Sequence, residues 1–342
     1  MIDIYIVIKE YDEKLAKRQP WYTIQKLISD LEYLNKKVEV VSSLKDVPLG
    51  FNNTVIKVFS LKDLVENNDF DYKLIYLMTF PAYSFSKLLF FPKDILKQNW
   101  SDLKRIFIFS MVPKFMVKNT LEKASMTLTI SDRSDEYISQ YAQTVKYYPF
   151  ISDNWGEYSK DIRSESKQKT IGYFGPPFTT RYFDEVVNFF SWIEEKGLHL
   201  KKKIITRIER DELKDIEDRY LSQFKDNPSF TIISGFLSRD ELAKQLCDID
   251  ILILPFRIVM SELPVVVLEA LELNIPIVTT KDSGIEILTK DMKNVLMLDE
   301  FSPRNYEKVI DFINTVKLED FNIIQDKIDM INKNAMEEIC QK

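Results

Sequence analysis

Apolar residues along this chain gather in short runs, and stretches with the period of an amphipathic helix separate those runs. The first run, residues 2–8, is dense in β-branched side chains, which is typical of a strand covered on both faces. Pro20 then opens a helix-period segment over residues 21–34. Further strands of the first half are predicted at residues 38–41, 54–59, 73–79, 105–110 and 127–131. Strands that alternate with helices predict right-handed βαβ units and a parallel sheet.

A polar, charged stretch at residues 152–169, SDNWGEYSKDIRSESKQK, interrupts this rhythm before a second alternation begins. The strands of the second half are predicted at residues 170–174, 203–207, 230–234, 249–254 and 275–279. The pattern predicts an α/β protein with two Rossmann-like, doubly wound domains in tandem and a ligand cleft between them. The expected divisions are an N-terminal domain (1–152), a linker (153–169), a C-terminal domain (170–317) and a last helix (318–342) packing back on the first domain.

Composition narrows the classes of function. The net charge of −6 and the isoelectric point near 5.2 argue against a nucleic-acid binder, which needs a net positive face. The chain has only 7 glycines and contains neither a G-x-G-x-x-G nor a Walker sequence, which argues against NAD-binding and P-loop proteins.

The cysteines and the histidine predict no metal site and no disulfide framework. Cys247 follows the helical pattern of a small buried thiol, and the single histidine, His199, lies in a polar run that suits the surface. Two cysteines suit a reducing compartment, and the acidic N-terminus does not resemble a signal peptide. No apolar run approaches the ~20 residues of a membrane span, so we expect a cytoplasmic protein.

Residues 234–288 carry the most chemical information. A strand that ends in proline leads there into a helix, and Glu262 and Glu269 lie around the start of that helix. A helix start attracts anions, because its first N–H groups are unpaired and the macrodipole is positive there. A carboxylate further along the helix can accept hydrogen bonds from sugar hydroxyls. One helix end could therefore hold both ends of a sugar nucleotide.

Five ordered motifs of the second half carry a family resemblance: IGYFG, FTIISGFLSRDEL, DIDILILPF, SELPVVVLEA and PIVTTKDSGIEIL. Residues 170–317 resemble the donor domain of GT-B glycosyltransferases, in particular the retaining glycosyltransferase family four (group 1). That family has two glutamates eight positions apart in the segment that matches SELPVVVLEA. Here Ser261 replaces the first glutamate, Glu262 lies one residue later and Glu269 matches the second. The resemblance implies that Glu269 binds the ribose hydroxyls.

The resemblance also implies cations after the first strand of this domain, where they neutralise the donor diphosphate. Arg181 is the leading candidate, because a guanidinium matches phosphate oxygens in a bidentate way. Together, Arg181, Glu262 and Ser261 form the expected catalytic set. The other residues expected at the donor are Arg207, Arg257, Thr180, Gly235, Phe236, Leu263, Ser283 and Gly284.

The first domain lacks the glycine pair and the histidine that the family often keeps, so its acceptor site is divergent. Candidate acceptor-side residues are Tyr83, Ser84, Asp132 and Arg133, for each of which a structural role is the alternative. The stretch YSFSKLLFFPKDILKQNW, residues 83–100, mixes aromatic residues with lysines. It predicts a buried helix with snorkelling lysines, and a peripheral membrane contact is the alternative.

Three functions stay open from the sequence. The leading one is transfer of a sugar, with retention, from a UDP- or GDP-sugar to a glycan, a glycoprotein or a lipid-linked sugar. The chemistry would rest on electrostatic stabilisation and would need neither a metal nor another cofactor. The alternatives are a non-catalytic GT-B-like subunit or sugar-binding protein, which the serine at position 261 favours, and a GT-B epimerase or phosphorylase, for which no specific motif exists.

Overall fold

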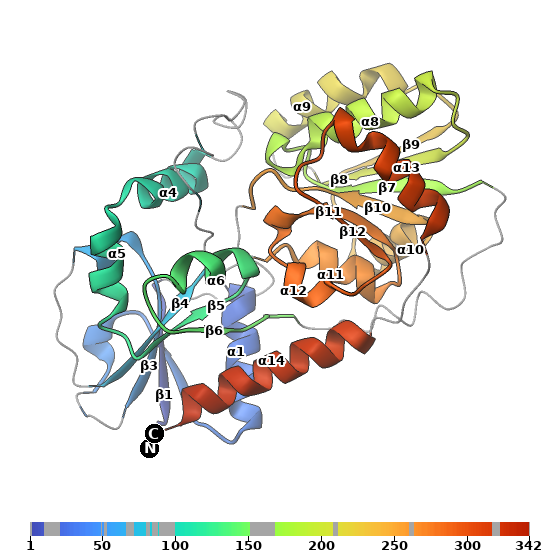
Figure 1. Cartoon of the computed structure of the whole chain (residues 1–342). Coiled ribbons are helices and arrows are strands. Elements are labelled where there is room, and N and C mark those ends of the chain that lie inside the picture. Colours follow the sequence, from blue (N-terminus) through green and yellow to red (C-terminus); the bar gives the residue numbers. More distant parts are fainter. Residues whose placement is uncertain are drawn as a thin grey trace.

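The computed structural model shows two α/β domains and a long C-terminal helix that contacts both (Figure 1). The predicted linker, residues 153–169, lies outside the described residues except for its last two. It describes residues 2–9, 21–48, 50, 53–65, 72–79, 83, 88, 100–150, 168–207, 211–259, 263–316 and 322–341. Each domain contains a six-stranded sheet in which every pairing between described strands is parallel. This arrangement confirms the predicted tandem of doubly wound domains.

The N-terminal sheet has the strand order β2-β1-β3-β4-β5-β6. Its strands are β1 (Ile4–Val7), β2 (Val38–Val41), β3 (Thr54–Val58), β4 (Lys73–Met78), β5 (Met126–Thr129) and β6 (Thr144–Lys146). Its helices are α1 (Trp21–Tyr33), η2 (Leu44–Asp46), η3 (Leu61–Leu64), α4 (Trp100–Met111), α5 (Lys114–Leu121) and α6 (Asp132–Ile138).

The C-terminal sheet has the order β12-β11-β10-β7-β8-β9, so the winding reverses between β7 and β10. Its strands are β7 (Thr170–Gly175), β8 (Lys201–Thr206), β9 (Phe230–Ser234), β10 (Ile251–Leu254), β11 (Ile277–Thr280) and β12 (Val295–Leu298). Its α-helices are α8 (Phe183–Glu195), α9 (Asp211–Leu221), α10 (Arg239–Cys247), α11 (Val265–Glu272), α12 (Glu286–Thr289) and α13 (Tyr306–Thr315). The short helices are η4 (Thr179–Arg181), η5 (Ser222–Phe224), η6 (Lys281–Ser283) and η7 (Pro303–Asn305).

Alternate residues of the central strands enter cores on opposite faces of each sheet. In β1, Ile4 and Ile6 pack in one cluster, whereas Tyr5 and Val7 pack in another. In β10, Leu252 and Leu254 join one cluster, and Ile251 and Ile253 join the cluster on the other face. Because both faces are covered, these strands are apolar throughout rather than alternating in polarity.

One predicted strand is wrong, and two strands were not predicted. Residues 105–110 belong to helix α4, in which Ile106 and Phe109 are buried at helical spacing while Ile108 is 38% exposed. A short apolar run has the same composition in a buried strand and in a helix, so periodicity could not separate them. β6 was missed because it has only three residues, and β12 because three of its four residues are only half-buried.

The burial of Cys247 and the exposure of His199 agree with the sequence-based predictions. Of the described helices, none is both long and apolar enough to cross a membrane.

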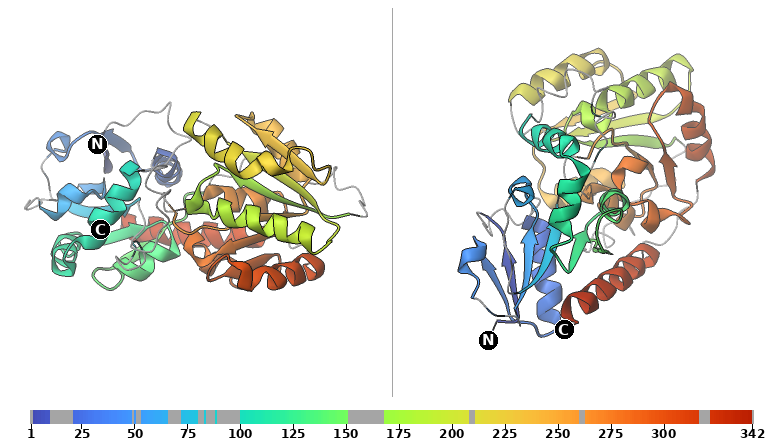
Figure 2. Two further views of the ribbon diagram at one scale, coloured as in Figure 1. Left: turned by 90° about the horizontal axis from the view of Figure 1, so that it is seen from above. Right: turned by 60° about the vertical axis from the view of Figure 1, so that its left-hand side comes forward.

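The last helix, α14 (Asn322–Cys340), packs against both domains (Figure 1 and the right-hand view of Figure 2). Ile324 and Ile328 enter a core cluster of the C-terminal domain, whereas Met336 and Ile339 enter one of the N-terminal domain. Between them lies the buried Asn332. Its Nδ2 donates to the carbonyl oxygen of Tyr148 and its Oδ1 accepts from the Tyr148 amide, both at 2.8 Å. The helix therefore contacts both domains, and near its centre it is hydrogen-bonded to the segment that follows β6.

Replacing Asn332 with alanine is expected to lower the free energy of unfolding by about 2–3 kcal/mol, because both backbone groups of Tyr148 lose their buried partner. Urea denaturation measures this effect. Asn334→Ala is the matched control, since Asn334 is exposed on the same helix. Equal losses in the two variants would contradict the role of Asn332 as a fastening point.

Candidate functional site

The carboxyl ends of the C-terminal strands bring together residues that the sequence singled out from four separate segments. β7 leads into η4, which contains Arg181, and β8 ends just before Arg207. β9 ends just before Gly235, and β11 leads into η6 and Gly284. In a parallel sheet all these ends lie at one edge, which is where open α/β sheets bind ligands.

Arg181 is held at this edge by a glycine and an aromatic ring. Gly175, with φ +143°, leaves the space for it, because a Cβ there would lie 2.6 Å from an Arg181 Nη. The guanidinium carbon lies 5.3 Å from the centroid of the Phe256 ring. Burial lowers the pKa of Arg181. The nearby charge of Arg207 lowers this pKa further, whereas Tyr173 and Glu269 raise it. Arg207 and Glu269 thus both lie near enough to Arg181 to act on its charge.

Arg207 and Phe236 form a second feature of the edge. The guanidinium carbon of Arg207 lies 5.2 Å from the centroid of the Phe236 ring, which is 74% exposed. Between them in the fold is Gly235, whose amide donates to the carbonyl oxygen of Thr206 at 3.0 Å. Gly235 has φ +119°, and apart from its chain neighbours no atom of the described residues lies within 4 Å of where its Cβ would be. A flat group can therefore approach this backbone closely.

Glu269 lies in the second turn of α11 and is half-buried. Leu263, just before this helix, is buried. Ser261 and Glu262 lie outside the described residues, so their predicted roles stay predictions.

Two hydroxyl groups that the sequence predicts at the sugar-nucleotide site are buried in this region. Thr180 and Ser283 have Oγ atoms that, within the described part of the chain, make no hydrogen bond. A buried polar atom without a partner is uncommon and is often explained by a missing ligand or water.

Arg257 is engaged with the protein itself. One Nη donates to the carbonyl oxygen of Thr179 at 2.7 Å, and the guanidinium pairs with Asp184 at 3.1 Å. The guanidinium carbon also lies 4.2 Å from the centroid of the Tyr182 ring. Arg257 therefore shapes the turn that carries Arg181, and it has fewer free donors for a ligand than the prediction assumed.

The acceptor-side candidates lie at contacts between the domains. Arg133 Nη2 donates to Asp282 Oδ1 at 2.6 Å, and Asp132 Oδ2 accepts from the Ile287 amide at 2.7 Å. The Tyr83 hydroxyl accepts from the Val259 amide at 2.9 Å. These contacts agree with the structural alternative for Tyr83, Asp132 and Arg133, and their role at the acceptor stays a prediction. Ser84 lies outside the described residues, as does most of the stretch 83–100.

Gly284 lies at a tight contact between the two domains. Its carbonyl oxygen accepts from the Asp132 amide at 2.9 Å, and a Cβ at Gly284 would lie 2.8 Å from Ser131 Cβ. Gly284→Ala is therefore expected to push the domains apart, visible as an increased radius of gyration in small-angle scattering.

The control for this prediction is Gly197→Ala. Gly197 has a similar φ, +65° against +69°, but within the described part of the chain no residue other than its chain neighbours comes within 4 Å of its Cβ position. Both variants carry the strain of a left-handed alanine, of about 1 kcal/mol. An unchanged radius of gyration in Gly284→Ala would show that the contact tolerates a methyl group.

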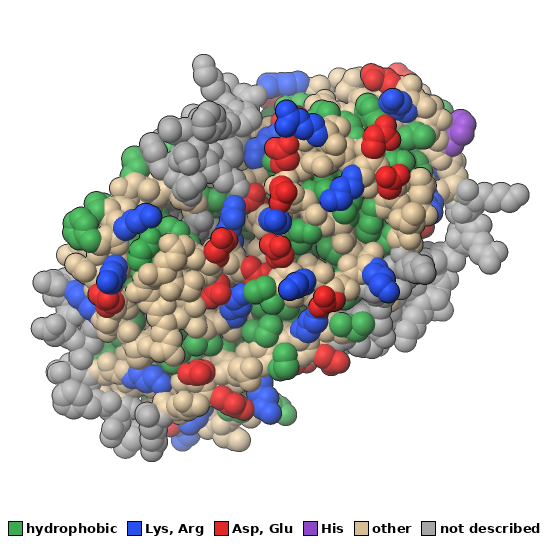
Figure 3. All heavy atoms as spheres, in the orientation of Figure 1, with side chains coloured by type: hydrophobic (Ala, Val, Ile, Leu, Met, Phe, Trp, Pro, Cys, Tyr) green, Lys and Arg blue, Asp and Glu red, His purple; other side chains and the backbone are tan. Residues whose placement is uncertain are grey.

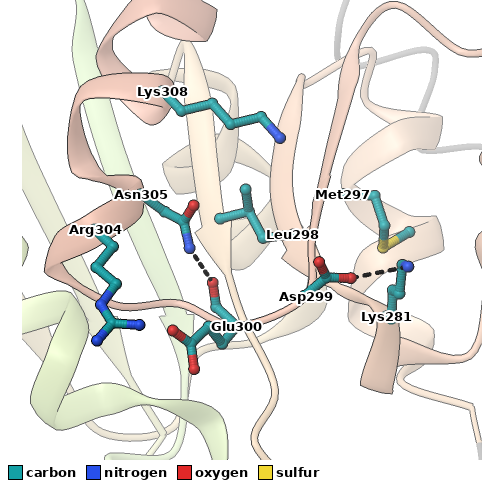
Figure 4. A pocket seen from close by; sticks show the side chains of 8 residues that line it. All are labelled: Lys281, Met297, Leu298, Asp299, Glu300, Arg304, Asn305 and Lys308. Carbon is teal, nitrogen blue, oxygen red and sulfur yellow. Dashed lines mark hydrogen bonds and ion pairs between the residues drawn. The ribbon is translucent and has the colours of Figure 1, made fainter.

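Two cavities lie beside η6, and neither was predicted from the sequence. A cavity of about 200 Å³ lies at the domain contact, lined by Asp132, Arg133, Glu136, Lys281 and Glu286. A larger one of about 540 Å³ lies beyond η6, lined by Lys281, Met297, Leu298, Asp299, Glu300, Arg304, Asn305 and Lys308 (Figure 4). Lys281 pairs there with Asp299 at 2.8 Å. None of the predicted donor residues lines the larger cavity.

Comparisons with known proteins agree with this geometry. Residues 186–314 match the family model described as glycosyl transferases group 1. No curated protein matches. Among solved structures, the chain resembles WaaG, a glycosyltransferase involved in lipopolysaccharide biosynthesis, at 11% identity and a TM-score of 0.58, over 99% of this chain and 100% of WaaG.

It also resembles HepE of Anabaena in complex with UDP and glucose, at 11% identity and a TM-score of 0.53, over the whole of both chains. A glycosyltransferase from Rickettsia africae gives 10% identity and a TM-score of 0.58, over 100% of this chain and 99% of that one. At these identities the structures establish the fold, and the family model concerns the C-terminal domain. The chain therefore has the GT-B fold, and its C-terminal domain resembles that of the group 1 glycosyltransferases.

Proposed function

We propose that the protein is a glycosyltransferase that moves a sugar, with retention, from a nucleoside-diphosphate sugar to an acceptor. The C-terminal domain binds the donor, and the N-terminal domain faces the acceptor. The observation that carries this proposal is the position of Arg181, against Gly175 and Phe256, and of Arg207, over Phe236, at the carboxyl edge of a domain that matches the group 1 family. Glu269 is near enough to Arg181 to raise its pKa. The HepE structure with UDP and glucose supports a nucleotide sugar as donor.

In the proposed reaction, the bond between the anomeric carbon and the diphosphate oxygen breaks, and the diphosphate leaves with the electron pair. An acceptor hydroxyl oxygen forms the new bond on the same face of the sugar and passes its proton to the departing diphosphate oxygen. Negative charge grows on the diphosphate as it departs, so cations placed in advance stabilise the transition state more than the substrate. Arg181 supplies the main charge, and Arg207 and the start of α11 add to it.

Glu269 has the complementary task in this proposal. Its carboxylate, on the helix that follows β10, accepts hydrogen bonds from the ribose hydroxyls. The Arg207–Phe236 pair and the open backbone at Gly235 receive the base. Because side-chain cations meet the diphosphate, the reaction needs no metal. Activity abolished by EDTA and restored by Mn²⁺ would contradict this part.

A second candidate is a non-catalytic GT-B protein that binds a nucleotide or a sugar. The serine at position 261, where the family has a glutamate, favours it. Titration calorimetry with UDP, GDP and their sugars, followed by donor-hydrolysis and transfer assays, separates the two. Binding accompanied by hydrolysis or transfer supports the enzyme. Tight binding without turnover towards a panel of acceptors supports the non-catalytic protein, and absence of binding contradicts both.

The acceptor is proposed to be a glycan, a glycoprotein or a lipid-linked sugar. Helices α4 and α5 favour the last, because Met111 and Phe115 are exposed beside the exposed Lys114 and Lys118. Figure 3 shows hydrophobic and basic side chains next to one another at the left of the molecule, where Figure 1 has α5. Residues 100–123 hold five Lys and Arg against two Asp and Glu, in a chain of net charge −6. Exposed apolar residues beside local positive charge suit an anionic membrane surface.

Phe115→Asp is expected to lower co-sedimentation with vesicles of 30% phosphatidylserine by about fivefold, since an apolar anchor becomes a like charge. The control is Tyr33→Asp, at another exposed aromatic residue of the same domain. Equal vesicle binding by the two variants would place any membrane contact elsewhere.

A further inference from the structure

A buried carboxylate joins the ends of two strands at the edge of the C-terminal sheet. Glu217 of α9 is 7% exposed and accepts hydrogen bonds from the hydroxyls of Thr206 and Ser234. Thr206 is the last residue of β8, Ser234 is the last residue of β9, and the two are paired in register. One side chain therefore spans the tips of neighbouring strands.

Holding two strands together with a buried carboxylate carries a high desolvation cost. Among the described residues, both of its hydrogen-bond partners are neutral hydroxyls, and no Lys or Arg forms an ion pair with it. Burying a carboxylate with neutral partners costs more than apolar packing of the same volume. The backbone ladder between β8 and β9 already joins these strands over five residue pairs. Glu217 thus adds little to strand pairing itself and acts on the loops into which the two strands lead.

These loops begin with the residues proposed to receive the nucleoside. Thr206 precedes Arg207, and Ser234 precedes Gly235 and Phe236. The carbonyl oxygen of Thr206 also accepts the Gly235 amide hydrogen bond at 3.0 Å. The separation of the two strand ends therefore sets how Arg207 lies over the Phe236 ring, 5.2 Å from its centroid.

We propose that Glu217 is a positioning residue of the donor site. By holding the hydroxyls of Thr206 and Ser234, it fixes the spacing of the Arg207–Phe236 pair that receives the nucleoside part of the donor. Glu217 itself does not touch the ligand. The inference rests on the proposed function, because it concerns the nucleotide that this function requires.

The test compares Glu217→Gln with the exposed Asp215→Asn of the same helix. Glu217→Gln keeps the shape but turns one hydroxyl acceptor into a donor. Calorimetry is expected to show UDP or GDP, whichever the wild type binds, held about fivefold or more weakly by Glu217→Gln and unchanged by Asp215→Asn. In the Phe236→Ala background, Glu217→Gln is expected to add almost nothing, since both act through one element.

Amide hydrogen exchange of the protein without nucleotide provides a second readout that does not depend on the ligand. Faster exchange in Glu217→Gln is expected at the Arg207 and Gly235 amides, whereas the sheet centre at Ile171 keeps the wild-type rate. Unchanged exchange at both amides, or additive losses of affinity in the double variant, would overturn the positioning role. A lowered melting temperature with unchanged affinity would likewise reduce Glu217 to a structural residue. Wild-type protein that binds no nucleotide would overturn the proposed function, and with it the site that Glu217 is said to serve.

Discussion

Replacing Arg181 with alanine is expected to lower kcat/KM for sugar transfer by about 100-fold or more. Its guanidinium lies at the carboxyl edge, against Gly175 and the Phe256 ring. Removing one preorganised donor from a developing negative charge typically costs about 10²–10³ in rate. Steady-state kinetics of transfer, or of donor hydrolysis where the acceptor is unknown, measures the loss.

Two further variants sharpen this prediction. Arg181→Lys retains the charge but loses the bidentate geometry, so its activity is expected to fall between those of the wild type and Arg181→Ala. Arg219→Ala removes an exposed arginine of α9 and is expected to behave like the wild type. Full activity in Arg181→Ala would show that the diphosphate is stabilised by other groups.

Glu269→Ala is expected to weaken nucleoside-diphosphate binding by about 10- to 100-fold. Hydrogen bonds to a charged acceptor contribute about 1.5–3 kcal/mol, and every 1.4 kcal/mol is a factor of ten. The loss should depend on the ribose, because that is the part Glu269 is proposed to hold. Wild-type protein is therefore expected to prefer UDP or GDP over the 2′-deoxy form, and Glu269→Ala is expected to bind both forms equally.

The deoxy comparison separates a ribose contact from a general loss of structure. Glu307→Ala, at an exposed carboxylate of α13, serves as the control and should keep the preference. If Glu269→Ala retains the wild-type preference for the ribose form, Glu269 does not bind the ribose.

Local patterns were sufficient to predict the architecture. Strands such as β1 and β10 are apolar runs of the right length between helix-period segments, and they pair as expected. Residues 105–110 were misassigned because a six-residue apolar run is compatible with either element. Packing decides between strand and helix for this run, because it buries Ile106 and Phe109 on one side of α4.

The candidate site was predictable where residues lie at or after the ends of strands. Arg207 ends a predicted strand, Gly235 comes directly after one, and Arg181 and Ser283 lie in the loops that follow two others. Parallel topology brings these strand ends together. Pairings across the chain were not predictable. Arg133 and Asp282 are 149 residues apart, and nothing local in either segment indicates their contact.

The sequence also could not show which charged side chains form contacts within the protein itself. Arg257 looked like a ligand for phosphate because it follows β10. The structure shows its guanidinium paired with Asp184 and stacked on Tyr182. Glu217 was overlooked because it lies in a polar helix with no motif around it, and only the fold brings it to Thr206 and Ser234.

The most direct measurement is a crystal structure with a bound nucleoside diphosphate that calorimetry has shown to bind. We expect diphosphate oxygens within hydrogen-bond distance of the Arg181 guanidinium and the ribose hydroxyls at the Glu269 carboxylate. A nucleotide bound instead in the cavity lined by Lys281, Arg304 and Lys308, with Arg181 and Glu269 turned away from it, would contradict the proposed donor site.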